Sequence, residues 1–301
     1  MGRVREIHRL RRRVRVGAPD PSVTSFSGMA AVTELVDRLG MIRLLDATIG
    51  PIKSRDRGFT GGQVLVGLAC AQLAGEDFLV GLDRYRADAA GQVLAAVPGL
   101  ASTTAAGLAR RFGDGQWRAL ETGLGNIAAA ALDILTAVAP QRAARLSETV
   151  TIDLDTTDVE VYGRLKRGVA FNHQGQRVGR PHVATWAETA TVLAADLMSG
   201  RDDPRPHAPE LLRRALAGLP ASARAGRIRL RADAGYFAGE LARAALFAGV
   251  EFAIGAAPCR PTSVMPISLA ADPSRGRRRA LVWLSVRSRA ACCSGIRGPI
   301  R

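Results

Sequence analysis

The sequence has few cysteines, almost no lysine and no long hydrophobic run. Its cysteines are Cys70, Cys259, Cys292 and Cys293, with neither a CxxC pair nor a Cys/His ligand spacing among them. This excludes a disulfide framework and the common zinc motifs, and it favours a reducing, cytoplasmic environment. No apolar run reaches the ~18 residues that a membrane-spanning helix needs. The Arg-rich N-terminus is not followed by the apolar segment of a secretory signal, so no membrane partner is expected.

Basic charge is concentrated at the two ends of the chain. The sequence of 301 residues holds 42 basic against 27 acidic residues, a formal charge of +15. Residues 1–16 carry a net +6 and residues 258–301 a net +8, so the middle is nearly neutral. Basic ends that flank a neutral body favour nucleic acid as a partner. Because only Lys53 and Lys166 are lysines, a GC-rich gene explains part of the arginine excess.

Hydrophobic periodicity divides the chain into four parts. Residues 1–25 are interpreted as a basic flexible arm and residues 26–147 as a helical domain. A helix pair at 28–49, split at Gly40, has the length of a helix-turn-helix, although such pairs usually serve packing. Residues 148–257 alternate between strand and helix patterns. Residues 258–301 lose this periodicity abruptly and are interpreted as a basic tail of low order, either native or, as the favoured alternative, the product of a shifted reading frame.

The segment 148–257 predicts an α/β fold with a mixed sheet. Its elements follow the order β-β-β-α-β-α-β, which suits three antiparallel strands followed by crossovers with helices on the sheet faces. Strands are expected at 149–155, 181–188, 191–198, 227–233 and 250–254, and helices at 209–219 and 237–248. In this order the first and fourth strands are neighbours in the middle of the sheet.

Three aspartates lie on those two central strands. Asp153 and Asp155 are two residues apart and therefore share one face of the first strand, and Asp233 ends the fourth. Such carboxylates can converge on a divalent cation such as Mg²⁺, and two ions about 4 Å apart support phosphoryl transfer. An aspartate at a strand end is also a common turn former, so the spacing alone leaves both interpretations open.

The sequence around these aspartates resembles a known family. Thr151–Arg164, with Lys166–Gly168 and Pro181–Trp186, is similar to the first catalytic motif of bacterial DDE transposases of insertion-sequence family 1380, within the IS4-like superfamily. Leu230–Phe237 resembles the second motif of that family. Leu35–Asp88 resembles its N-terminal, DNA-binding domain. The resemblance spans about residues 26–257.

The resemblance implies an RNase H-like catalytic core, partial in this chain, preceded by an all-α domain. It maps the first family carboxylate onto Asp155, with Asp153 as the less favoured candidate, and the second onto Asp233. Asp155 and Asp233 would be the metal ligands for Mg²⁺ or Mn²⁺, with two ions in a complete site. The implied reaction is nicking at transposon ends, followed by attack of the 3′-hydroxyl on target DNA.

The third acid of the family, a glutamate on a downstream helix, has no counterpart. After Asp233 the only acidic residues are Glu240, Glu251 and Asp272. The first two come too early in the chain, and the third lies in the anomalous tail. We therefore expect a transposase that is truncated or frameshifted at its C-terminus, with weak or absent catalysis.

Basic residues gather around the first motif. Five of them are expected to contact DNA phosphates: Arg164, Lys166, Arg167, Arg177 and Arg180. A solvated hairpin is the alternative, and His182 on the next strand is interpreted as a hydrogen-bonded structural histidine. The resemblance implies double-stranded DNA as partner, both transposon ends and target, a homodimer on paired ends, and a nucleoid-associated cytoplasmic location.

Two other functions compete with the transposase interpretation. The run from Asp153 to Thr157 also fits the DxDx[TV] pattern of haloacid-dehalogenase-like phosphatases, in which the first Asp is a nucleophile. The strands that follow, and the lack of a downstream Gly-Asp-x-x-x-Asp motif, disfavour it. The second alternative is a non-catalytic transposase remnant that binds DNA without cutting it.

Overall fold

The computed structural model describes residues 5–9, 12–16, 18, 20–55, 57–163 and 165–255. The tail interpreted from residue 258 onward lies outside them. The chain forms two compact units, Met1–Leu120 and Glu121–Arg301. The division falls well before the expected boundary at residue 147, because Leu132 and Ala143 belong to the hydrophobic core of the sheet unit. The last helices of the expected helical domain are thus part of the second unit.

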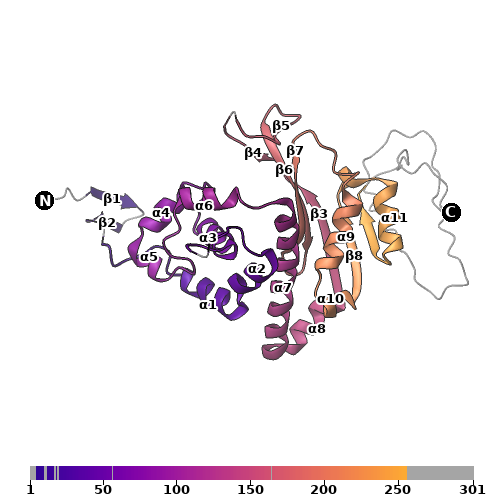
Figure 1. Ribbon diagram of the computed structural model, residues 1–301, viewed down its shortest axis with the longest axis horizontal. Helices are drawn as coiled ribbons and strands as arrows, with labels where there is room; N and C mark the ends of the chain where they lie inside the picture. Colours follow the sequence, from indigo (N-terminus) through magenta and orange to yellow (C-terminus); the bar gives the residue numbers. More distant parts are fainter. Residues whose placement is uncertain are drawn as a thin grey trace, which may run out of the picture. The chain divides into compact units, whose positions relative to one another are not determined.

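The first unit begins with a two-stranded hairpin. Strands β1 (Arg5–Arg9) and β2 (Arg12–Val16) pair antiparallel, in the interval expected to be a flexible arm. The alternation of arginine and valine in β2 has the period of a strand, which accounts for the difference. This hairpin carries the indigo colour of the N-terminus in Figure 1.

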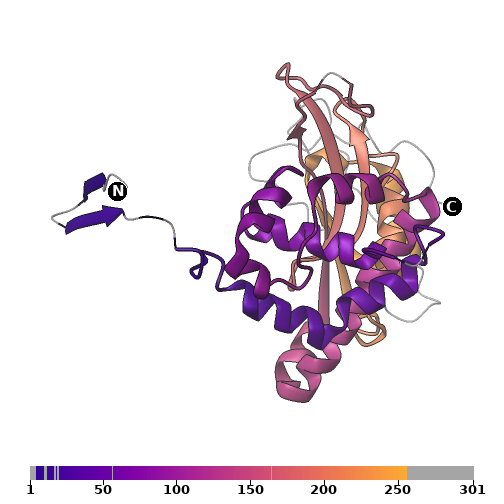
Figure 2. The ribbon, with the colours of Figure 1, turned by 60° about the vertical axis from the view of Figure 1, so that its left-hand side comes forward.

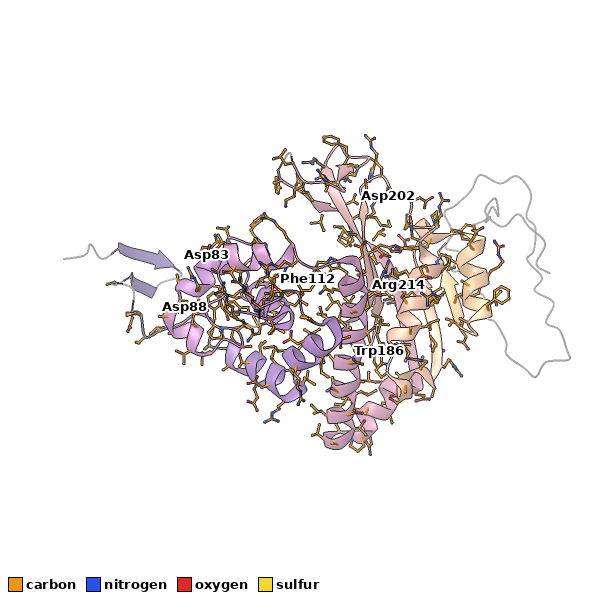
Figure 3. All side chains as sticks on the ribbon, viewed as in Figure 1. Asp83, Asp88, Phe112, Trp186, Asp202 and Arg214 are labelled. Carbon is orange, nitrogen blue, oxygen red and sulfur yellow. The ribbon has the colours of Figure 1, made fainter. Side chains whose placement is uncertain are left out.

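The rest of the first unit is helical, as expected. Its helices are α1 (Met29–Leu39), α2 (Met41–Ile49), α3 (Gly61–Leu73), α4 (Gly81–Ala87), α5 (Ala89–Val93), α6 (Ser102–Ala109) and the start of α7 (Asp114–Val138). Gly40 separates α1 from α2 with a left-handed φ of +59°, which glycine adopts without a Cβ penalty. Thr60 and Gln63 form a capping box that begins α3. The carboxylate of Asp83 (Figure 3) accepts the Ser102 N–H at 3.0 Å, at the N-terminal end of α6.

The second unit is a mixed sheet with helices packed against it. After α7 and α8 (Pro140–Glu148), its strands are β3 (Thr149–Thr156), β4 (Val159–Glu160), β5 (Ala170–Phe171), β6 (Arg177–Trp186), β7 (Thr191–Ser199), β8 (Arg227–Ala232) and β9 (Glu251–Ile254). The helices α9 (Ala208–Gly218), α10 (Ala221–Arg224), η1 (Ala234–Tyr236) and α11 (Gly239–Phe247) lie between them in the chain. Figures 1 and 2 show the long strands side by side, and β4 and β5 pair with the first residues of β6.

The sheet topology confirms the expected neighbours. The strand order is β4-β6-β3-β8-β9, with β5 and β7 also pairing with β6. β3 lies antiparallel to β6 and parallel to β8, and β8 lies parallel to β9. The even-numbered side chains of β3 from Val150 to Leu154 are buried, whereas the odd-numbered ones are partly or fully exposed. The aspartates therefore lie on the less covered face of the central strand.

Candidate active site

The structure brings Asp155 and Asp233 together at one edge of the sheet. The parallel register of β3 and β8 ends with Leu154 beside Ala232, so Asp155 and Asp233 are the next residue on each strand. Asp233 continues in extended backbone geometry, with φ −77° and ψ −176°. Neighbouring strands lie about 4.8 Å apart. Two exposed carboxylates thus occupy adjacent positions at the carboxyl ends of the central strands.

Each of the two carboxylates is held by a backbone amide. Asp155 Oδ1 accepts the N–H of Thr156 at 2.8 Å, and Asp233 Oδ1 accepts the N–H of Gly235 at 2.9 Å, which caps η1. Neither carboxylate forms an ion pair with a residue in the described ranges. Each has a second carboxylate oxygen that remains available to a cation.

Asp153 has a different environment, although it lies on the same face of β3. It stands directly across from Arg231 of β8. Arg231 donates from Nε to Asp153 Oδ1 at 2.7 Å and from Nη2 to Oδ2 at 2.5 Å. This bidentate pair engages both oxygens of Asp153. The geometry therefore favours Asp155 over Asp153 as a metal ligand.

Two buried aromatic residues lie beneath the carboxylates. The rings of His182 and Tyr236 are 5.5 Å apart, and His182 stands across from Thr156 in the register of β3 and β6. Burial raises the pKa of Tyr236, and the negative charges of Asp155 and Asp233 raise it further. Burial lowers the pKa of His182. Both side chains are therefore neutral near pH 7 and form an uncharged floor below the site.

The expectation for His182 was wrong in one respect. The side chain is fully buried on β6, as expected of a structural histidine. Neither of its ring nitrogens has a hydrogen-bond partner in the described part of the chain. It stands across from Thr156 on β3 and from Asp196 on β7, and a sequence pattern does not reveal whether either side chain reaches its ring nitrogens.

The basic residues expected to contact DNA divide into two groups. Arg177 donates to the carbonyl oxygens of Gly163 and Lys166. Arg180 donates from Nε to Asp158 Oδ1 at 2.8 Å and to the carbonyl of Asp202 at 3.0 Å. These two arginines hold the loops around β4 and β5 in place.

The other members of the set lie on the loop between β4 and β5. Lys166 and Arg167 are exposed there, and they remain free to meet an anion. Arg164 lies outside the described residues. Contact of this set with DNA phosphates stays a prediction.

Among the described residues, the acids that follow Asp233 do not complete a three-carboxylate site. Glu251 stands beside Arg229, at the opposite end of the strands from Asp233, which at roughly 3.3 Å per residue is roughly 13 Å away. It pairs with Arg229 at 3.2 Å, and Glu240 pairs with Arg243 at 3.0 Å. Asp272 lies outside the described residues. Within those residues, no group of three or more His, Cys, Asp or Glu side chains is placed to hold a metal ion.

The chain after Asp155 differs from the arrangement that a haloacid-dehalogenase-like phosphatase needs. In place of a βα unit, β3 is followed by the short β4 and β5 and by β6, which pairs antiparallel with β3. The first parallel neighbour of β3 is β8, which comes after two intervening helices. This order is the one expected for the transposase interpretation.

Comparison with known protein families gives one match that covers most of the chain. The family model for Transposase DDE domain group 1 matches residues 8–275, a range that begins before and ends after the segment 26–257. Comparison with curated proteins and with solved structures found no significant match. Among the described helices, none combines the length and the apolar character needed to cross a membrane. The matched range and the mixed sheet with its preceding helices show that the chain belongs to the DDE transposase family, domain group 1.

Proposed function

We propose that this transposase cuts and joins DNA strands with a divalent cation held by Asp155 and Asp233. The observation that carries the proposal is their position on adjacent strand ends, without an ion-pair partner among the described residues. Insertion-sequence family 1380 is the subgroup we propose, because the residues from Thr151 to Arg164 and from Leu230 to Phe237 resemble its two motifs.

The residues present fit a hard cation. Like charges that face each other across two strands destabilise a sheet, and a cation between Asp155 and Asp233 would remove that cost. Mg²⁺ is commonly held by one or two carboxylates together with water and substrate phosphates. Bound there, Mg²⁺ or Mn²⁺ would supply a Lewis acid and an activated nucleophile for phosphodiester cleavage.

The surrounding residues have separate tasks in this proposal. The backbone amides of Thr156 and Gly235 fix one oxygen of each carboxylate. The buried rings of His182 and Tyr236 keep water from the lower side of the site. The exposed Lys166 and Arg167 would meet phosphates of the DNA strand that enters the site.

We propose that cutting by this chain is slow. Only two carboxylates meet at the site within the described residues, and fewer ligands hold a metal ion less firmly and in a less defined geometry. The same observation favours a second candidate function, in which the protein binds DNA ends, as a homodimer on paired ends, without cutting them.

A nicking assay separates these functions. The substrate is a supercoiled plasmid that carries the DNA flanking the gene, incubated with the full chain and Mn²⁺ or with EDTA. We expect slow nicking that requires Mn²⁺ and falls to the EDTA background in Asp155→Asn and in Asp233→Asn. Glu240→Gln, which removes an exposed acid outside the site, is the matched control and keeps the wild-type rate.

Each other outcome has a defined meaning. Nicking that survives in Asp233→Asn, or that proceeds in EDTA, contradicts the two-carboxylate site. Metal-independent DNA binding without any nicking favours the non-catalytic function.

A further inference from the structure

The helical unit contains a basic cavity that the two-carboxylate site does not use. The cavity has a volume of about 600 Å³ and lies between the loop before α3 and the outer face of α6. The described part of the chain contributes eleven lining residues, none of them acidic and four of them basic, namely Lys53, Arg55, Arg57 and Arg111. All of them belong to the first compact unit.

The loop of this cavity is closed by its lysine. Lys53 Nζ donates to the carbonyl oxygen of Gly58 at 3.0 Å and also to that of Arg57. Gly58 follows with a φ of +69°, a left-handed geometry that glycine adopts without a Cβ penalty. The ammonium group of Lys53 is therefore engaged by two carbonyl oxygens of its own loop, and these hydrogen bonds stabilise the loop conformation.

The three arginines of the cavity, unlike Lys53, have no side-chain hydrogen bond to the described part of the chain. Arg55, Arg57 and Arg111 are exposed, and their guanidinium groups form no ion pair or hydrogen bond with a residue of the described ranges. Arginines in the sheet unit, such as Arg180 and Arg231, are by contrast paired with carboxylates. Unpaired guanidinium groups around one hollow form a site for an anion.

The opposite wall of the cavity adds neutral hydrogen-bond donors. Thr103 and Thr104 are exposed on the first turn of α6 and line the same cavity as Arg111. Arginine and threonine side chains are among those that contact the sugar–phosphate backbone of DNA. The described lining residues include no carboxylate that would accept hydrogen bonds from a base or from an amine ligand.

We propose that this cavity binds phosphates of the DNA backbone, so that Arg55, Arg57 and Arg111 hold duplex DNA on the helical unit. The inference rests on the proposed function, because it assumes that DNA is the substrate. It assigns DNA binding to arginines of the loop before α3 and at the end of α6, whereas the helix pair that has the length of a helix-turn-helix lies at residues 28–49. Interactions of this kind do not depend on base sequence and weaken with salt.

The test measures DNA binding of the full chain as a function of salt. Fluorescence anisotropy of a labelled duplex gives the binding constant. The slope of its logarithm against the logarithm of salt concentration falls by about 0.9 for each phosphate that the protein no longer neutralises. The variant is Arg55→Ser with Arg111→Ser. The control is Arg86→Ser with Arg110→Ser, which removes two arginines of the same unit that do not line the cavity.

We expect the cavity variant to bind at least tenfold more weakly at moderate salt, with a slope lower by about 2, and the control to keep a slope close to wild type. Equal weakening in the two variants would overturn the cavity assignment while leaving DNA binding intact. If the double variant does not fold, Arg55→Ser alone, on the surface loop, must lower the slope by about 1. A wild-type chain that binds no DNA would overturn the proposed function together with this inference.

Discussion

Strands β3 and β8 carry two kinds of charged pair on the same face of the sheet, and the second pair comes two residues after the first along each strand. Inside the sheet, Asp153 stands across from Arg231 and the two form a bidentate ion pair. At the carboxyl end, Asp155 stands beside Asp233, and no described residue neutralises either of them. Opposite charges stabilise adjacent strands and like charges destabilise them. The two neighbouring carboxylates at the strand end therefore repel each other, and a bound cation would relieve this repulsion.

The largest expected effect comes from the most buried interior pair. Arg214 of α9 (Figure 3) is buried and donates to Glu121 Oε1 at 2.5 Å and also to Asp196. Arg214→Met leaves two carboxylates of the same unit without their cation. We expect a decrease of about 3 kcal/mol in the free energy of unfolding, measured by urea denaturation.

The neighbouring residue provides the control for this prediction. Arg213 pairs with Glu210 on the exposed side of the same helix, so Arg213→Ser is expected to cost less than about 0.5 kcal/mol. An equal decrease in the free energy of unfolding of the two variants would mean that the buried ion pairs of Arg214 contribute no more than the exposed pair of Arg213. This result would contradict the prediction.

The second prediction concerns whether the removal of each aspartate charge raises or lowers the free energy of unfolding. In EDTA, Asp155→Asn and Asp233→Asn each remove a like-charge repulsion and are expected to raise the free energy of unfolding by up to about 1 kcal/mol. Asp153→Asn removes the partner of Arg231 and is expected to lower it by about 0.2–1 kcal/mol, because the pair is partly exposed. Thermal unfolding of the four proteins at low ionic strength measures both changes.

Salt provides an internal check on that prediction. Because the charges at the strand end are exposed, high ionic strength screens them, and the stabilisation by Asp155→Asn is expected to shrink. If Asp155→Asn or Asp233→Asn lowered the free energy of unfolding in EDTA, the carboxylates would stabilise the fold. That result would contradict the predicted repulsion between them.

Much of the fold follows from local patterns in the sequence. The period of two in residues 149–155 and 227–233 predicts the central strands, and the order of elements predicts that they are neighbours, which the register confirms. The expected helix break at Gly40 is also confirmed. The short β4, β5 and α10 were missed, because elements of two to four residues carry too little periodicity to be recognised.

The candidate site was less accessible from the sequence. Period-two geometry places Asp153 and Asp155 on one face but does not reveal that Arg231 neutralises only Asp153, since this depends on the register between strands far apart in the chain. The roles of Arg177 and Arg180 as loop clamps were hidden for the same reason. A basic cluster in sequence thus does not reveal which of its members also have hydrogen-bond partners within the chain.

The most direct test of the account is a titration of the full-length protein with Mn²⁺ in the absence of DNA, followed by the decrease of the free-ion electron paramagnetic resonance signal. We predict that the wild-type chain and Asp153→Asn both bind Mn²⁺, and that Asp155→Asn and Asp233→Asn each weaken the binding at least tenfold. Equal Mn²⁺ affinity in all four proteins, or a weakening confined to Asp153→Asn, would contradict the assignment of the metal site to the paired carboxylates at the strand ends.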